Sequence, residues 1–212
     1  MKKSLSKLNL LHKKIEGIEL KGVWKWLDPG YSFIEIMLPY YDYLRADVFV
    51  SDIKMFEPDS DIDVGQLVAM VYLQFVLDIR RGEKYSDLNA LANYLMSLKE
   101  QYISSRSKTE TIEELLQQDE NTWALQPVSD TSQRTDRYAD IKLRIKSSEI
   151  YRTEVLLHDL MEIEPSFNLA TEDLITVMFL RYIKQLKENG NNSTTMRQAV
   201  QAYEFYCKKG IL

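Results

Sequence analysis

Apolar and polar residues alternate over a short stretch of this chain that begins near residue 31. Ile34, Ile36 and Leu38 fall at every second position, and this period of two predicts a half-buried β-strand. Pro39 is expected to end the strand, because proline has no backbone N–H to donate to a neighbouring strand. A second strand is predicted from about residue 46 to residue 56.

After the predicted strands, apolar residues recur at helical spacing along the chain. Residues 64–80 are apolar on nearly every side, which is typical of a helix covered on most of its faces. Gly82 is expected to end this helix. Residues 86–103 have apolar positions on one side only and predict an amphipathic helix. The basic residues 4–15 show the same spacing and predict a short amphipathic helix at the start of the chain.

A polar stretch, residues 104–137, separates this pattern from the rest of the chain. We interpret it as a connector, because it lacks a sustained apolar period. Within it, residues 109–118 are expected to form a short helix that Thr109 or Thr111 would cap.

The pattern of residues 31–103 returns when the chain is aligned with itself so that Tyr31 matches Tyr138. We call this alignment the repeat shift. Apolar positions of the predicted strands and of the long helix then stay in phase, which is demanding because a one-residue slip reverses the faces of a strand. The sequence therefore predicts an α+β fold made by tandem duplication of a strand–strand–helix–helix (β-β-α-α) unit with pseudo-twofold symmetry. Other matching pairs include Arg45 with Arg152, Glu57-Pro58 with Glu164-Pro165, Leu67 with Leu174, and Val71 with Met178.

The repeat divides the chain into four predicted parts. Residues 1–30 hold the basic helix and the first turn, residues 31–103 the first repeat, residues 104–137 the connector, and residues 138–212 the second repeat. A two-stranded unit is marginally stable alone. We therefore expect the second repeat to cover the long apolar helix of the first.

Composition and charge narrow the class of protein. The single cysteine, Cys207, excludes an intrachain disulfide, and no apolar run approaches the roughly 20 residues that span a bilayer, so a cytoplasmic protein without membrane contact is expected. The formal net charge is −5, yet residues 1–26 contain seven lysines and two glutamates. An acidic body with a basic arm is not typical of a dedicated duplex-DNA binder.

Candidate catalytic residues are few. The two histidines, His12 and His158, lie in unlike contexts, and the repeat shift matches His158 with Ser51. Cys207 is expected to be a small buried hydrophobic residue. The sequence has no Gly-rich phosphate loop and too few cysteines and histidines for a zinc site, so no cofactor is predicted. It favours a non-enzymatic protein and leaves enzymatic activity open.

Four carboxylates recur in both repeats. Asp52 and Glu57 match Asp159 and Glu164, near the end of a predicted strand. Carboxylates there can hold Mg²⁺ or Mn²⁺, which makes a divalent-metal-dependent phosphodiesterase or nuclease one alternative function. The favoured interpretation is structural: the Glu-Pro pairs form turns, Asp52 pairs with Arg45, and Asp159 pairs with Arg152.

Aromatic and basic residues suggest two kinds of binding. Tyrosine is enriched at contact surfaces, so the first hypothesis is a binding or regulatory protein that acts through protein–protein contacts, with its partner unidentified and homo-oligomer formation left open. The candidate contact residues are Tyr40, Tyr41, Tyr43, Trp24 and Trp26. The alternative is nucleic-acid binding through the basic arm and residues 134–152, with aromatic rings stacking on bases. Its candidate residues are Lys2, Lys3, Lys7, Lys13, Lys14, Arg134, Arg137 and Arg144.

Overall fold

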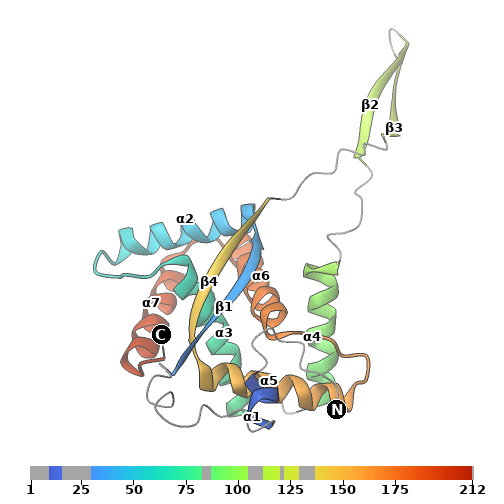
Figure 1. Cartoon of the computed structure of the whole chain (residues 1–212). Coiled ribbons are helices and arrows are strands. Elements are labelled where there is room, and N and C mark those ends of the chain that lie inside the picture. Colours follow the sequence, from blue (N-terminus) through green and yellow to red (C-terminus); the bar gives the residue numbers. More distant parts are fainter. Residues whose placement is uncertain are drawn as a thin grey trace.

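The chain folds into an α+β structure in which the order strand–helix–helix–helix occurs twice (Figure 1). The computed structural model describes residues 10–15, 30–82, 87–104, 112–119, 122–128 and 137–211. The first run comprises β1 (Tyr31–Pro39), α2 (Tyr40–Phe56), α3 (Val64–Arg81) and α4 (Leu88–Tyr102). The second comprises β4 (Tyr138–Lys146), α5 (Ser147–Ile163), α6 (Thr171–Asn189) and α7 (Ser193–Lys208). Helix α1 (Leu10–Ile15) precedes the first run, and β2 (Ile112–Asp119) and β3 (Thr122–Val128) lie between the two.

Strands β1 and β4 pair as a two-stranded antiparallel sheet, hereafter the ribbon. The strand predicted around residues 34–38 is confirmed, but its partner comes from the other half of the chain. Glu35 faces Lys142 at the centre of the ladder. The repeat shift also carries Glu35 onto Lys142, so the register of the ribbon is symmetric about this pair.

One face of the ribbon is buried against helices. Both strands show the same alternation of buried and exposed residues, as expected for a sheet with one covered face. Helix α3 contacts β4, and α6 contacts β1. The buried residues of this inner face are Ile34, Ile36, Leu38, Ile141, Leu143 and Ile145.

Helix α3 is the long apolar helix that the sequence predicts. It begins with a reciprocal cap: the N–H of Gln66 donates to Asp63 Oδ1 at 2.7 Å, and the N–H of Asp63 donates to Gln66 Oε1 at 2.9 Å. It ends at Gly82, whose φ of 67° suits glycine. Helix α4 is confirmed as well. No helix among the described residues is long and apolar enough to cross a bilayer.

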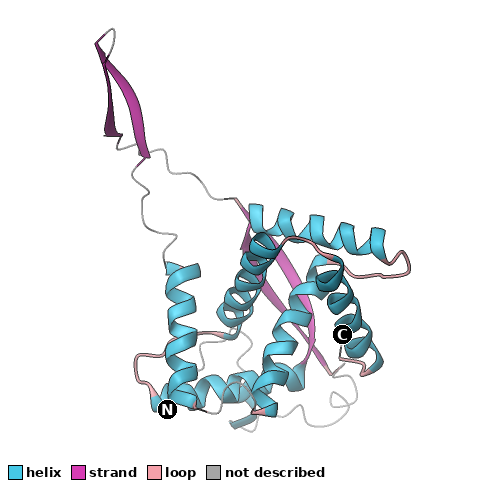
Figure 2. Cartoon of the chain, turned by 180° about the vertical axis from the view of Figure 1, so that it is seen from behind, coloured by secondary structure: helices cyan, strands magenta, loops and turns pink. Residues whose placement is uncertain are grey.

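The last helix of each half packs against the other half. Helix α7 contacts α2 and α3, whereas α4 contacts α5 and α6. Figures 1 and 2 show α4 and α7 on opposite sides of the central pair α3 and α6, which also contact each other. Each half therefore supplies a helix that covers part of its neighbour's core.

The predicted second strand at residues 46–56 is wrong, because these residues belong to α2. The first turn of this helix also contains the candidate contact residues Tyr40, Tyr41 and Tyr43. Val48 and Met55 lie on the exposed side of this helix, at 50% and 84% exposure. The order in each half is thus β-α-α-α rather than β-β-α-α. The buried residues of α2 recur at helical spacing: Ala46, Phe49, Val50 and Ile53.

Residues 109–118 were expected to be helical, but residues 112–119 form strand β2, which pairs with β3 in an antiparallel hairpin. Among the described elements, β2 and β3 contact only each other. Figure 1 shows this hairpin standing away from the helices.

Candidate functional site

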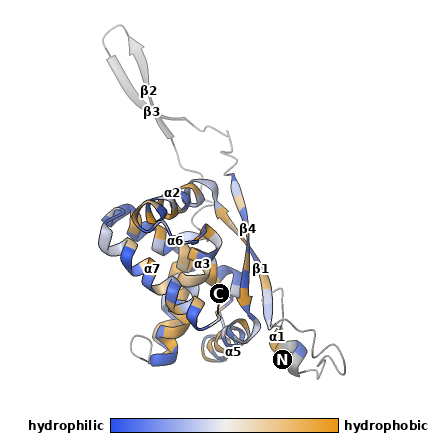
Figure 3. Cartoon of the chain, turned by 90° about the vertical axis from the view of Figure 1, so that its left-hand side faces the viewer, coloured by the Kyte–Doolittle hydropathy of each residue, from blue (hydrophilic) through white to orange (hydrophobic). Residues whose placement is uncertain are grey.

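The outer face of the ribbon is exposed to solvent, and Figure 3 shows α2, α3, α6 and α7 on its other side. Three large apolar side chains stand on this outer face: Phe33 is 53% exposed, Met37 is 63% exposed and Tyr138 is 47% exposed. Large apolar groups that share an exposed sheet face are characteristic of contact surfaces. We therefore treat the outer face as the candidate site.

Basic side chains of β4 lie beside the aromatic rings of β1 on the same face. Arg144 is placed 4.0 Å from the ring centroid of Tyr31, and the ammonium of Lys142 is 5.0 Å from the ring centroid of Phe33. Cation–π contacts of this kind hold the charged groups in place over the rings. Asp140, opposite Met37, adds an acid to the face. The outer face thus mixes apolar and aromatic side chains with the bases Lys142 and Arg144 and the acids Glu35 and Asp140.

The predicted tyrosine cluster lies at one end of the ribbon. The N–H of Tyr40 donates to the carbonyl of Arg137 at 2.7 Å, which joins the start of α2 to the start of β4. Tyr40 and Tyr41 are 44% and 70% exposed, whereas Tyr43 is half-buried and stacks on Tyr40 with ring centroids 6.2 Å apart. The structure thus brings the exposed tyrosines to the end of the ribbon where Tyr138 stands.

The structure describes only some of the other predicted binding residues. Trp24, Trp26, Lys2, Lys3, Lys7 and Arg134 lie outside the described residues. Lys13 and Lys14 belong to α1, where Lys13 is exposed, and the side chain of Lys14 is not described. Arg137 is exposed just before β4, and Arg144 stands on the outer face of the ribbon.

Helix α1 is attached to the body of the protein. The backbone N–H of Leu11 donates to Glu154 Oε2 of α5 at 2.6 Å, and both residues are buried. A carboxylate is stabilised by such a contact because the first N–H groups of a helix lack partners within the helix. The described end of the basic arm is therefore docked on α5 and is not a free chain.

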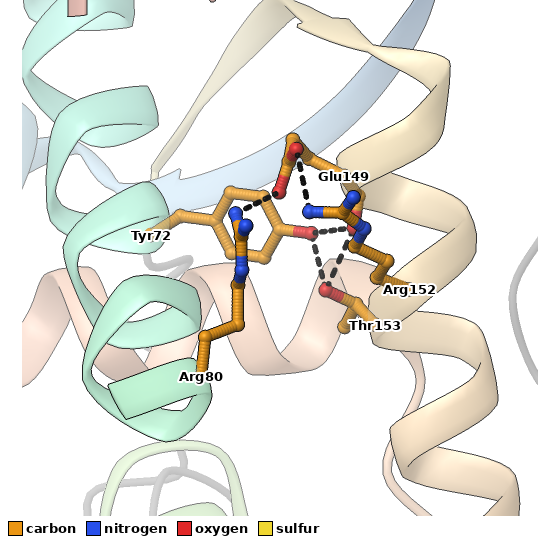
Figure 4. A network of polar contacts seen from close by, with 5 residues as sticks. All are labelled: Tyr72, Arg80, Glu149, Arg152 and Thr153. Carbon is orange, nitrogen blue, oxygen red and sulfur yellow. Dashed lines mark hydrogen bonds and ion pairs between the residues drawn. The ribbon is translucent and has the colours of Figure 1, made fainter. Parts of the chain in front are cut away.

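A buried polar network lies between α3 and α5 (Figure 4). The hydroxyl of Tyr72 is 2.5 Å from Thr153 Oγ1, and it donates to the carbonyl of Glu149 at 3.3 Å. Glu149 in turn pairs with Arg80 at 3.9 Å and with Arg152 at 3.3 Å. Burial raises the pKa of Tyr72, so its hydroxyl stays protonated at neutral pH and serves as a donor. We interpret the network as structural, because its hydrogen bonds join buried side chains of α3 and α5.

The four recurrent carboxylates sit on helices or directly after them, rather than at strand ends. Asp52 accepts a hydrogen bond from the amide of Asn191, and Arg45 donates to Asn191 Oδ1 at 3.0 Å, so Asn191 bridges the pair that was expected to meet directly. Glu57 and Glu164 follow the last residues of α2 and α5.

Hydrogen bonds occupy the carboxylate of Glu164. Its Oε1 accepts from the hydroxyl of Ser166 at 2.8 Å and from the N–H of that residue at 3.1 Å, and these bonds lower the pKa of Glu164. Asp159 is exposed on α5. Among the described residues, no three acids, histidines or cysteines converge in a way that could hold a metal ion.

The remaining reactive residues are not assembled into a site. His158 Nδ1 lies 3.8 Å from Glu162 Oε1, one turn along the same helix. Cys207 is exposed, which corrects the prediction that it is buried. Sequence reasoning missed the outer face of the ribbon, because the alternation around residue 35 shows which side chains share a face but does not show that this face is uncovered.

Comparison with protein-family models, with curated proteins and with solved structures found no match to this chain.

Proposed function

We propose that this chain is a non-enzymatic binding protein whose contact surface for a protein partner is the outer face of the ribbon. The observation that supports the proposal is the exposure of Phe33, Met37 and Tyr138 together on one side of β1 and β4. A stable protein interface usually has a core of aromatic and Met side chains with polar residues at its rim. Lys142 and Arg144 would provide part of that rim.

Site-specific photo-crosslinking tests this surface. A benzoylphenylalanine placed at Met37 in cells that make the protein natively should give one major protein adduct. The same group at Met55, which is 84% exposed at the end of α2, is the matched control. Phe33→Ser should reduce the adduct at position 37 about fivefold or more, because an aromatic anchor of an interface contributes over 1 kcal/mol to binding. Equal adducts at positions 37 and 55 would contradict the proposal.

Nucleic acid is a second candidate for the same face. Lys142, Arg144 and Lys146 recur at every second position of β4, and a two-stranded antiparallel ribbon fits the major groove of B-DNA. The double variant Lys142→Gln/Arg144→Gln should then weaken binding to duplex DNA and make the affinity less dependent on salt. Absence of duplex binding at low salt would refute this candidate and leave the protein-contact proposal intact.

We make no proposal for metal-dependent phosphodiester chemistry. The carboxylates on which that alternative rests are Asp52, Glu57, Asp159 and Glu164. They lie at or near the ends of helices, and two of them already accept hydrogen bonds from neighbouring side chains.

We also infer that the chain arose by tandem duplication, with residues 31–103 and 138–212 as the two repeats. Strands β1 and β4 have nine residues each, and α2 and α5 have 17 each. The repeat shift also relates two ion pairs to each other. Asp42 pairs with Lys187 at 2.7 Å, and the residues that match them, Glu149 and Arg80, pair at 3.9 Å. Recurrence of an ion pair between separate helices is not expected of two unrelated amphipathic segments.

A further inference from the structure

An open cavity of about 730 Å³ lies between α3, α6 and α7. Sites that bind small molecules usually occupy about 300–1,000 Å³ and combine an apolar lining with a few polar groups. Buried apolar side chains line this cavity, among them Met70, Phe75 and Met178. Exposed glutamines stand at its edge, including Gln74 and Gln185. The cavity therefore has the size and the lining of a small-molecule site.

Arg181 of α6 is the cation in the cavity wall. It is half-buried, donates to the hydroxyl of Tyr94 on α4, and lies 5.3 Å from the centroid of that ring. Within the part of the chain that the structure describes, no carboxylate pairs with Arg181, whereas Lys187 of the same helix pairs with Asp42. Because a guanidinium has five N–H donors, those that Tyr94 does not use could form charge-assisted hydrogen bonds with a bound anion.

The charge at this position is not required by the fold. The repeat shift places Gln74 where the second half has Arg181, and both lie in the wall of the same cavity. The wall also holds one acid, Asp78, which accepts a hydrogen bond from the Gln74 amide at 2.7 Å. Arg181 is thus the group of the wall that is best suited to recognise a charged ligand.

We propose that this cavity binds a small amphipathic anion, with its carboxylate or phosphate group on Arg181 and its apolar body against Met70, Phe75 and Met178. This proposal is independent of the contact surface on the ribbon, because the cavity is formed by α3, α6 and α7. A ligand there would contact both halves of the chain, since α3 belongs to the first half, and α6 and α7 belong to the second.

Calorimetric titration of the full chain tests the proposal with three probes of ten carbon atoms each: decanoate, decyl phosphate and the uncharged 1-decanol. The charged probes should bind about tenfold or more tightly than decanol, and Arg181→Gln should remove that advantage while leaving decanol unchanged. Arg197→Gln is the matched control, because Arg197 is exposed on the same α7 that forms a wall of the cavity and is not one of the lining residues. The tighter of the two charged probes identifies the head group.

A charge-conserving variant separates recognition from folding. Arg181→Lys should retain most of the preference for the charged probes, and Ala202→Phe, at the α7 wall, should weaken all three by filling the cavity. Failure of all three probes to bind the unaltered protein would overturn the proposal. Equal binding of decanoate and decanol, or equal losses in Arg181→Gln and Arg197→Gln, would overturn it as well.

Discussion

Replacing Tyr72 and Thr153 together should cost less free energy of unfolding than the two single replacements added. Their hydroxyl oxygens lie 2.5 Å apart, and both reach the carbonyl of Glu149, at 3.3 Å and 3.2 Å. The positions related to them by the repeat shift hold Phe179 and Ala46, which are also buried. The double variant Tyr72→Phe/Thr153→Ala therefore reproduces an apolar pair that the same fold already accommodates.

The expected loss in the free energy of unfolding depends on which hydrogen bonds each variant keeps. Tyr72→Phe removes one buried hydroxyl but leaves Thr153 bonded to the Glu149 carbonyl, so a loss of about 1 kcal/mol is expected. Thr153→Ala removes a methyl group and the main partner of the Tyr72 hydroxyl, so a loss of about 1–3 kcal/mol is expected. In the double variant no hydroxyl loses its partner. The coupling energy between the two positions should be about 1 kcal/mol.

Urea unfolding of the unaltered protein, the two single variants and the double variant, followed by far-ultraviolet circular dichroism, gives this coupling energy directly. A control cycle combines Tyr72→Phe with Thr195→Ala, whose hydroxyl donates to Asn192 within the first turn of α7. The control pair should be additive within about 0.3–0.5 kcal/mol. Additivity of the same quality for Tyr72 and Thr153 would refute the reasoning.

Three further measurements probe other contacts. Burial raises the pKa of Tyr206 to about 12. Because the unfolded chain releases that proton first, the free energy of unfolding should fall from about pH 10 upward, and Tyr206→Phe should lessen the fall measured by urea unfolding between pH 9 and 12. Asn191→Ala should lower the free energy of unfolding by about 1–2 kcal/mol, because it removes the bridge between Arg45 and Asp52; an unchanged urea midpoint would contradict this. Glu154→Gln should speed amide hydrogen exchange in residues 10–15, since a neutral acceptor holds the Leu11 N–H more weakly; unchanged exchange would show that α1 is held by other contacts.

The sequence predicts much of the fold where one segment decides its own structure. The period of two around Ile36 marks β1, and the apolar run after Asp63 with its glycine stop marks α3. Residues 46–56 misled because Val48, Phe49 and Val50 are residues that strands favour. Their buried positions nevertheless follow a helical period, which outweighs local preference once the segment packs on the core.

Long-range pairing could not be predicted in the same way. The alternation in β1 does not specify whether its partner is a neighbouring segment or a strand of the other half, because both would bury the same residues. The Tyr72–Thr153 contact spans 81 residues and has no local signal. The repeat did contain a signal for this contact. The repeat shift matches Tyr72 with Phe179 and Thr153 with Ala46, so the related pair lacks both hydroxyl groups.

The central claim is that the two halves interlock, through the shared ribbon and through helices α4 and α7 that each cover the opposite half. The most direct measurement is cleavage of the folded full chain at a protease site inserted between residues 120 and 121, which separate β2 from β3 in the sequence. The cut chain should sediment as one particle and unfold in one transition, with both fragments lost together. Fragments that separate under native conditions and unfold independently would contradict the account.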